Sequence, residues 1–327
     1  MKKDKNHGNN MEQLVTGKAN LDVFAETLSE LAEENRNIMV VTSDSRGSAR
    51  LAAFAARLPD QIVEVGIAEQ NLVGVAAGLA SAGKTVFAVS PACFLTARAL
   101  EQIKNDIAYS NQPVTLVGIS AGVSYGPLGS THHSIHDVAV LRAIHNIGII
   151  VPADNFETRE AVLAAAASQR PVYLKLGKKA MPHLPRESGC FEPGKASLIC
   201  RGNDVAIIAC GETVAPAYQA AQKMQGMGIT TEVISMHTVK PPDREAVIRA
   251  ASKCRAVITT EEHSISGGLG EACASLFLEA SICKPFKILG IPDEETVTGS
   301  QTEIFCHYGI SAEGITKTAL SLISLSR

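Results

Sequence analysis

From about residue 19, the chain alternates between short apolar runs and longer stretches with apolar residues at helical spacing. The first helical stretch, LDVFAETLSELAEEN, follows Asn20, which we expect to cap the helix. Next comes IMVVTSD at 38–44, a continuous apolar run bounded by polar residues, which is typical of a buried strand. Strands that alternate with helices in this way predict parallel sheets covered by helices on both faces.

The same alternation continues on both sides of one irregular stretch. Before it, we expect strands at 61–66, 84–90, 113–120, 146–154 and 171–177, and helices at 49–57, 70–82, 96–109 and 156–168. After it, we expect strands at 204–210, 229–235, 256–262 and 284–291, and helices at 214–227, from 242, at 269–279 and at 312–325. The irregular stretch is rich in proline, glycine and serine, which favours a linker. The predicted organisation is a polar tail at 1–18, an α/β domain at 19–180, a linker at 181–197 and a second α/β domain at 198–327.

Composition excludes several classes of function. Apolar residues make up 46% of the 327 residues, enough for two buried cores, and 30 Lys and Arg nearly balance 33 Asp and Glu. Without a basic excess or an apolar run as long as a bilayer span, we expect no nucleic-acid or membrane partner. The segment MKKDKNHGNN lacks the apolar core of a signal peptide, and the eight cysteines form no C-x-x-C pair, so we expect a cytoplasmic protein with reduced, buried thiols.

The segment EVGIAEQN at 64–71 places a carboxylate, Glu69, at the start of a helix among small apolar residues. Two interpretations are open: an acidic residue favours the first turn of a helix, where the dipole is positive, or the carboxyl group does proton chemistry in a dry site. Ligands of parallel sheets bind beyond the carboxyl ends of the strands, which are followed here by SDSRGS, SPACF and SAGVSYGPLGSTHH. The last loop is long, rich in glycine and carries two adjacent histidines, which indicates a chemical role.

Three segments together resemble the pyrimidine-binding domain of transketolases and deoxyxylulose-phosphate synthases: EVGIAEQN, FLTARALEQIKNDI at 94–107, and GSTH at 129–132. The second half resembles the C-terminal domain of these enzymes, through HTVKPPD at 237–243 and TTEEHSISGGLGEA at 259–272. Each motif alone is weak, but their order and spacing over nearly the whole chain are specific. The resemblance implies a thiamine diphosphate enzyme that transfers a two-carbon ketol unit from a ketose to an aldose.

The resemblance also implies roles for individual residues. Glu69 matches the glutamate that bonds N1′ of the aminopyrimidine ring and activates the cofactor, and a buried carboxyl group is suited to share that proton. Phe94 matches the aromatic residue stacked on the pyrimidine, and Asp44 an aspartate that closes over the thiamine; the plain alternatives are a core phenylalanine and a helix N-cap. His132 matches the histidine that contacts substrate oxygens, whereas His133 stands where the family often has glutamine.

At the substrate end the sequence departs from the family pattern. Ser48 matches a substrate-contacting serine, but Lys178 replaces an arginine, which keeps the charge and loses the bidentate fork. Leu128 stands where the family has an aspartate, Ser120 where it has a histidine, and Leu21 where it has an arginine. Together these changes predict a non-standard sugar rather than an ordinary pentose phosphate.

One half of the cofactor site has no counterpart in the sequence. The diphosphate needs a divalent cation, usually Mg²⁺, which the family holds through a G-D-G…N motif in a separate N-terminal domain. The nearest strings, GNN at Gly8 and GND at Gly202, lie in the wrong context. We therefore expect no metal ligand in this chain, an N-terminal transketolase subunit with the motif as partner, and an α2β2 assembly. His263, in EEHS, is expected at a domain or subunit contact.

Two other interpretations remain open. The beta subunit of a 2-oxo acid dehydrogenase has a similar length and also lacks the metal motif, although THH at 131–133 and FLTARALEQI favour a transketolase. The third interpretation is a non-catalytic thiamine-binding partner chain, against which the presence of Glu69 and His132 argues.

Overall fold

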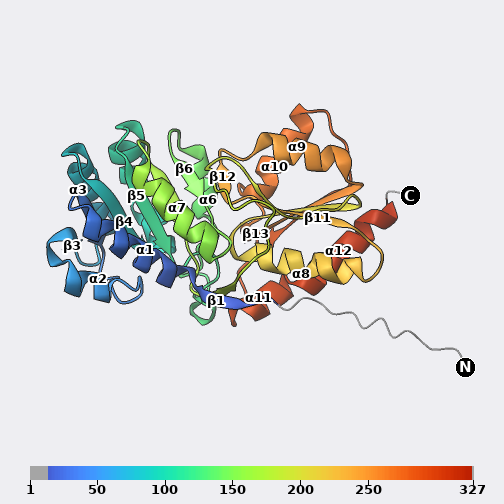
Figure 1. Ribbon diagram of the computed structural model, residues 1–327, viewed down its shortest axis with the longest axis horizontal. Helices are drawn as coiled ribbons and strands as arrows, with labels where there is room; N and C mark the ends of the chain where they lie inside the picture. The colour runs from blue at the N-terminus through green and yellow to red at the C-terminus, as the bar shows by residue number, and fades with distance from the viewer. Residues whose placement is uncertain (1–13, 326–327) are drawn as a thin grey trace, which may run out of the picture.

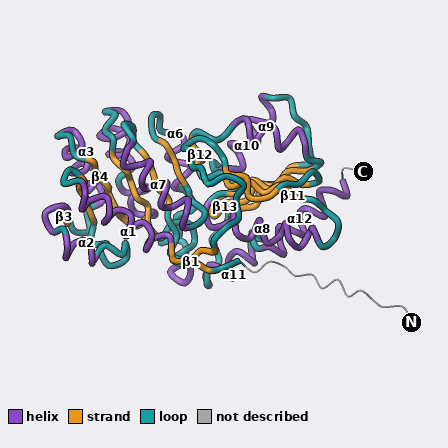
Figure 2. The backbone as a smooth tube through the Cα atoms, in the orientation of Figure 1, coloured by secondary structure: helices purple, strands orange, loops and turns teal. Residues whose placement is uncertain are grey.

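Two mostly parallel sheets, each covered by helices on both faces, lie side by side in the computed structural model, which describes residues 14–325 (Figure 1). This confirms the predicted fold class. The arrangement follows from the strands: β5 (Val114–Ile119) and β10 (Val205–Ala209) are buried at every position, so both faces of each sheet need a cover. In Figure 2 the strands form two separate orange groups with purple helices on either side.

The first sheet has seven strands in the order β12-β6-β7-β5-β4-β2-β3, and only the β12–β6 pair is antiparallel. Its other strands are β2 (Ile38–Thr42), β3 (Ile62–Glu64), β4 (Thr85–Pro91), β6 (Gly148–Ile150), β7 (Val172–Lys175) and β12 (Thr238–Lys240). One face packs against α1 (Asn20–Glu34), α2 (Ala52–Arg57) and α7 (Asn155–Ala167). The other packs against α3 (Glu69–Ser81), α4 (Ala92–Arg98), α5 (Leu100–Gln102), the π-helix η2 (Ile103–Tyr109) and α6 (Asp137–Ala143).

The second sheet has five strands in the order β14-β13-β10-β11-β9, with only β9 antiparallel to its neighbour. The strands besides β10 are β9 (Ser197–Cys200), β11 (Thr231–Ser235), β13 (Ala256–Ser264) and β14 (Phe286–Ile291). On one face lie α9 (Arg244–Lys253) and α10 (Leu269–Glu279), and on the other α8 (Val214–Gln225) and α12 (Ala312–Leu325). The short α11 (Gln301–His307) follows the loop after β14.

Strand exchange ties the two halves together. Strand β12 comes from the second half of the sequence but pairs with β6 at the edge of the first sheet, as Figure 1 shows at the boundary between the halves. In addition, one hydrophobic cluster extends from α3 and the first sheet to α9, α10 and the second sheet. The two halves therefore share part of their core, which fixes the loops of one against the other.

Several element boundaries differ from those predicted. Asn20 does not cap α1 but is its first residue, because its buried side chain accepts a hydrogen bond from Nδ2 of Asn155 at 3.1 Å. The helix predicted at 49–57 begins at Ala52, since Arg50 has a φ of 61°, outside the helical region. The helix predicted at 96–109 is divided among α4, α5 and η2, with no glycine or proline to mark the break. The elements α6, α11, β9 and β12 were not predicted.

Parts of the predicted tail and linker form regular structure. Residues 1–13 of the tail lie outside the described residues, whereas Thr16–Ala19 form β1, which pairs antiparallel with β8 (Ala180–Pro182) at the start of the linker. Ser197, the last residue assigned to the linker, begins β9. The pairing closes the first half with a small two-stranded sheet beside α11 (Figure 1). The domain boundaries themselves stay a prediction.

Two expectations from composition can also be compared with the structure. All eight cysteines are free; Cys210 and Cys273 are buried as expected, but Cys190, Cys283 and Cys306 are exposed, so burial is not uniform. Among the helices of residues 14–325, none is both long and apolar enough to cross a membrane.

A glycine in the first sheet gives a test of this packing. A Cβ at Gly118 on β5 would lie 2.2 Å from the hydroxyl oxygen of Tyr173, which is fully buried on β7. We expect Gly118→Ala to lower the free energy of unfolding by about 1 to 3 kcal/mol through overpacking, measured by urea denaturation of the full chain. The control is Gly78→Ala on α3, where nothing lies within 4 Å of the new Cβ, and which should stabilise by about 0.5 to 1 kcal/mol. Equal effects of both changes would contradict the packing described.

Candidate active site

The site residues lie on loops and helices that follow the strands of the first sheet. Glu69 comes after β3, Phe94 after β4, His132 after β5 and Lys178 after β7. Because these strands are parallel neighbours, their carboxyl ends meet at one edge of the sheet. Segments that are far apart in the sequence are therefore neighbours at this edge.

Glu69 is a buried carboxylate at a helix start. It is the first residue of α3, its side chain is 2% exposed, and its Oε2 lies 2.6 Å from Nη1 of Arg98. A carboxylate this deeply buried needs a compensating partner, which the half-exposed guanidinium supplies. Both interpretations of the sequence agree with this position, since the first helical turn and a dry environment coincide here.

A series of ring contacts leads from Arg98 across the site. The Arg98 guanidinium lies 5.3 Å from the centre of the half-buried Phe94 ring, and that ring meets the imidazole of His132 edge-on at 5.4 Å. The His132 ring also contacts Tyr125, with 5.5 Å between the ring centres, and Nζ of Lys178 lies 4.8 Å from the centre of the Tyr125 ring. We call these connected side chains the site cluster: Glu69, Arg98, Phe94, His132, Tyr125 and Lys178.

Two members of the site cluster were missed in the sequence. Arg98 lies four residues after Phe94 on α4, and this spacing places both side chains on one helix face, so the motif FLTAR held the signal. Tyr125 is the only aromatic residue in the loop between Ser120 and His132, but no spacing rule connects it with either. Its contact with Lys178 arises because the loops after β5 and β7 are neighbours.

Asp44 and Ser48 occupy the neighbouring loop after β2. Asp44 is exposed with a φ of 53°, and its N–H donates to Oε1 of Glu64 at 2.6 Å. It caps no helix, because the residue that precedes α2 is Leu51. The Ser48 hydroxyl donates to the backbone oxygen of Ser45 at 3.1 Å. In the described part of the chain, no hydrogen bond or ring contact joins Asp44 or Ser48 to the site cluster.

The positions that depart from the family pattern differ in their surroundings. Leu128 is 54% exposed in the loop after β5, whereas Ser120 is fully buried at the end of that strand with a φ of 52°. Leu21 is 2% exposed and packs beside Phe24 in the core under α1.

The two other histidines that the sequence singled out, His133 and His263, have structural contacts. His133 is buried, with Nδ1 2.8 Å from Oγ1 of Thr296 and Nε2 3.0 Å from the backbone oxygen of Gly126, and its burial lowers its pKa. His263 accepts a hydrogen bond at Nε2 from the backbone N–H of Ala139 at 3.2 Å, so it lies at the contact between the halves, as expected. No three His, Cys, Asp or Glu side chains within residues 14–325 gather as a metal site.

Comparison with known proteins identifies both halves. Residues 17–183 match the family model described as transketolase, pyrimidine binding domain, and residues 194–315 match transketolase, C-terminal domain. The chain is 48% identical over 302 residues to a subunit of the apulose-4-phosphate transketolase from Phocaeicola vulgatus, covering 92% of this chain and 96% of that protein. It is 35% identical over 298 residues to a 6-deoxy-6-sulfo-D-fructose transketolase subunit from a Clostridium species, covering 91% and 92%.

A solved structure agrees with these relatives. The fold matches that of a chain described as a split gene transketolase, inactive beta4 tetramer, with a TM-score of 0.84 and 35% sequence identity. The match covers 95% of this chain and 100% of that one. By its two matched domains and its full-length relatives, the chain belongs to the transketolase family and consists of the pyrimidine-binding and C-terminal sections of that family.

Proposed function

We propose that the chain is the C-terminal subunit of a split, thiamine-diphosphate-dependent transketolase that works in the cytoplasm with an N-terminal partner chain. The observation that carries the proposal is the site cluster: a buried carboxylate, an aromatic ring and a histidine meet at the carboxyl edge of a parallel sheet. In the reaction, the bond between C2 and C3 of a ketose breaks and its two-carbon unit joins the aldehyde carbon of an acceptor. No net oxidation occurs.

The residues of this chain fit one end of thiamine diphosphate. The cofactor supplies the carbanion chemistry when bound. The Glu69 carboxylate suits a hydrogen bond to the aminopyrimidine, and the half-buried Phe94 ring, which is connected to Glu69 through Arg98, suits stacking on that ring. Asp44, exposed on the next loop, is assigned to the thiamine side. We assign the diphosphate and its divalent cation to a partner chain with the G-D-G…N motif, because the family holds them through that motif in a separate N-terminal domain.

The other members of the site cluster face the substrate in this proposal. His132 has its Nδ1 2.9 Å from the Thr131 hydroxyl, and it is assigned to a substrate oxygen, where imidazole can donate or take up a proton. Lys178 offers an exposed ammonium group for an anionic end of the sugar, and Ser48 a hydroxyl for its hydroxyl groups. Glu69 holds the proton at the pyrimidine nitrogen.

The substrate we propose is a ketose phosphate with a non-standard carbon skeleton, tested first as apulose 4-phosphate. Two relatives, at 48% and 38% identity, are named for that substrate. The exposed, apolar Leu128 supports a changed substrate, because it replaces a carboxylate with a surface that cannot accept hydrogen bonds from hydroxyl groups. No observation favours the beta subunit of a 2-oxo acid dehydrogenase or a non-catalytic partner chain.

The partner assignment predicts a joint activity. When the chain is purified from its native cells, we expect it to carry a companion with the G-D-G…N motif in equal amount, as an α2β2 complex by light scattering. Ketol transfer should require both chains, thiamine diphosphate and Mg²⁺, and should disappear after EDTA treatment and return with added Mg²⁺. A lipoyl-domain companion would instead indicate a dehydrogenase, and a chain active alone would contradict the split site.

The role of Glu69 predicts a loss of rate without a loss of fold. In the assembled enzyme, Glu69→Gln should lower kcat by about 10²- to 10⁴-fold, because the amide cannot hold the proton at the pyrimidine nitrogen. The matched control is Glu30→Gln, which also breaks a pair with an arginine, to Arg159 at 2.7 Å, but on the surface. Its kcat should stay within about twofold. A Glu69→Gln enzyme with wild-type kcat would refute the assignment.

Substrate selection at Leu128 gives a separate prediction. Leu128→Asp restores the carboxylate of the family pattern. We compare kcat/KM for xylulose 5-phosphate with kcat/KM for apulose 4-phosphate, and we expect the ratio of the first to the second to rise about tenfold. This factor corresponds to one added hydrogen bond that contributes about 1.4 kcal/mol. The control Leu278→Asp changes a leucine that is 79% exposed on α10 and should leave the ratio unchanged. A wild-type preference for xylulose 5-phosphate over all other ketoses would overturn the proposed substrate.

A further inference from the structure

The loop that bears Tyr125 and His132 is held by the second half of the chain. We call residues 121–134 the substrate loop. Near its end, the Ser130 hydroxyl lies 2.9 Å, and Nδ1 of His133 2.8 Å, from Oγ1 of Thr296 in the segment after β14. Near its start, the backbone N–H of Val123 donates to Oε1 of Glu262 on β13 at 2.8 Å.

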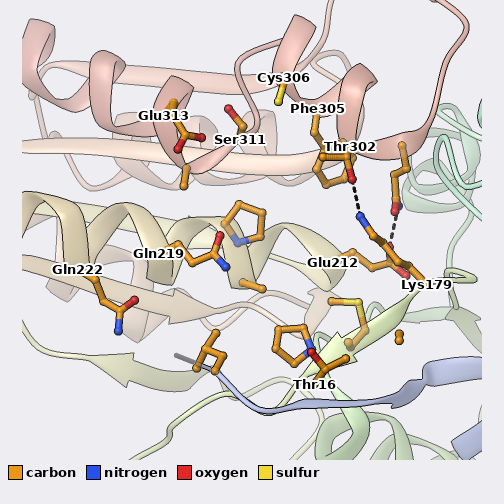
Figure 3. Close-up of a pocket in the computed structure, with 18 of the residues that line it drawn as sticks. Thr16, Lys179, Glu212, Gln219, Gln222, Thr302, Phe305, Cys306, Ser311 and Glu313 are labelled. Carbon is orange, nitrogen blue, oxygen red and sulfur yellow. Dashed lines mark hydrogen bonds between the residues drawn. The ribbon is translucent and has the colours of Figure 1, made fainter. Parts of the chain in front are cut away.

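Glu262 belongs to a trio of side chains, of which the two carboxyl groups are buried and the amide is half-buried. Nε2 of Gln301 on α11 donates to Oε1 of Glu262 at 2.9 Å and to Oε2 of Glu212 at 2.6 Å. Both carboxyl groups are 7% exposed, and Glu212 lies in the short 3-10 helix η4 (Gly211–Thr213) after β10. Glu212 lines a cleft of about 750 Å³. Figure 3 shows Glu212 near Lys179 in this cleft, with a hydrogen bond from Lys179 to Thr302. The trio connects this cleft with the substrate loop.

The approach of the loop to Glu262 is unusually close. Gly122 has a φ of 61°, and a Cβ on it would lie 2.2 Å from Cδ of Glu262. Only glycine can adopt this conformation at this distance without strain. The backbone is thus pressed against the carboxyl group, and two residues later the chain reaches Ser124 and then Tyr125 of the site cluster.

We propose that Glu262 is a positioning residue for ketol transfer: its carboxyl group, held by Gln301 beside Glu212, fixes the Val123 amide and thereby the placement of Tyr125 and His132. This inference rests on the proposed function for the role of His132. The hydrogen bond between Val123 and Glu262 does not depend on the proposed function, because it can be tested in the chain without any enzymatic activity.

The surroundings of the trio give the contact a pH dependence. Burial raises the pKa of both Glu212 and Glu262, and the charge of Glu212 raises the pKa of Glu262 further. The charge of Lys175 on β7 opposes this rise at both groups, and the charge of Lys179 opposes it at Glu212. Cys210 after β10, and Glu261 and His263 on β13, line the same pocket as the two carboxyl groups, and Asp137 on α6 pairs with Lys175. A raised carboxyl pKa contributes stability that is full below its ordinary value of 4.5 and is lost as pH rises through the folded value. The Val123 and Gln301 hydrogen bonds favour the charged form of Glu262. As pH rises through about 7 for Glu212 and about 8 for Glu262, however, two adjacent negative charges form, and their repulsion should loosen the substrate loop.

The test compares three variants of the assembled enzyme. Glu262→Ala removes the acceptor of the Val123 amide, Glu262→Gln keeps an acceptor and removes the titration, and Glu261→Ala is the matched control. Glu261 is also buried on the same strand, but it accepts from the backbone of Leu269 and Gly270 instead of the substrate loop. KM and kcat for apulose 4-phosphate, the proposed ketose substrate, are measured between pH 6 and 9. Hydrogen–deuterium exchange of residues 121–134 is measured on the full chain.

We expect Glu262→Ala to raise KM about tenfold with a smaller change in kcat, and to raise exchange at Val123 about tenfold, since one hydrogen bond to a carboxyl group is lost. We expect the KM of the wild type to rise toward pH 9, and Glu262→Gln should keep KM within about twofold at pH 7 and remove this rise. Glu261→Ala should lower Tm and leave both KM and exchange in the loop unchanged.

The outcomes separate this inference from the proposed function. If exchange and KM in Glu262→Ala match those in Glu261→Ala, or if Glu262→Gln keeps the wild-type pH profile, the positioning role is overturned. If Glu262→Ala does not fold, the pH profile of Glu262→Gln decides. If the wild-type complex shows no ketol transfer, the proposed function fails, while the exchange at Val123 still tests whether Glu262 holds the loop.

Discussion

The buried ammonium group of Lys175 is the contact on which the arrangement of the site depends. Its Nζ lies 2.8 Å from Oδ1 of Asp137 on α6 and reaches the backbone oxygens of Ser134 and Glu262. A charge that is only 6% exposed stays inside a fold only where other groups compensate it. The end of β7, α6, the end of the substrate loop and β13 must therefore meet at one point, and this point joins the two halves.

Among the groups around Lys175, one carries the opposite charge and another is neutral. Burial would raise the pKa of Asp137, but the charge of Lys175 brings it below its usual value, so this carboxylate stays ionised and also accepts from the Tyr173 hydroxyl at 2.7 Å. Burial lowers the pKa of His263 to about 4, so its imidazole is neutral and accepts from the Ala139 amide. Because the side chains of Lys175, Asp137 and His263 are paired and apolar packing surrounds them, the second half holds the loops of the first in place.

The site cluster follows from this arrangement as much as from its own residues. Glu69, Phe94, His132 and Lys178 were identified in the sequence, and the structure joins them in one series of contacts. The connections come from Arg98 and Tyr125, which the sequence did not single out. Likewise, the trio around Glu262 combines an acid from each of two strand ends with an amide from a helix that was not predicted. Such groups meet only after two sheets have packed together.

The sequence by itself determined the α/β class, most of the strands and helices, and the motifs that hold the candidate site residues, because apolar periodicity and short motifs are local properties of the chain. It did not determine the crossing of β12 into the first sheet, the pairing of β1 with β8, or the start of α1 at Asn20, because each depends on partners far away along the chain. Burial of Glu69 and its pairing with Arg98 were decided in the same way, since the environment of a carboxyl group is set by the packing around it and not by its neighbours in sequence.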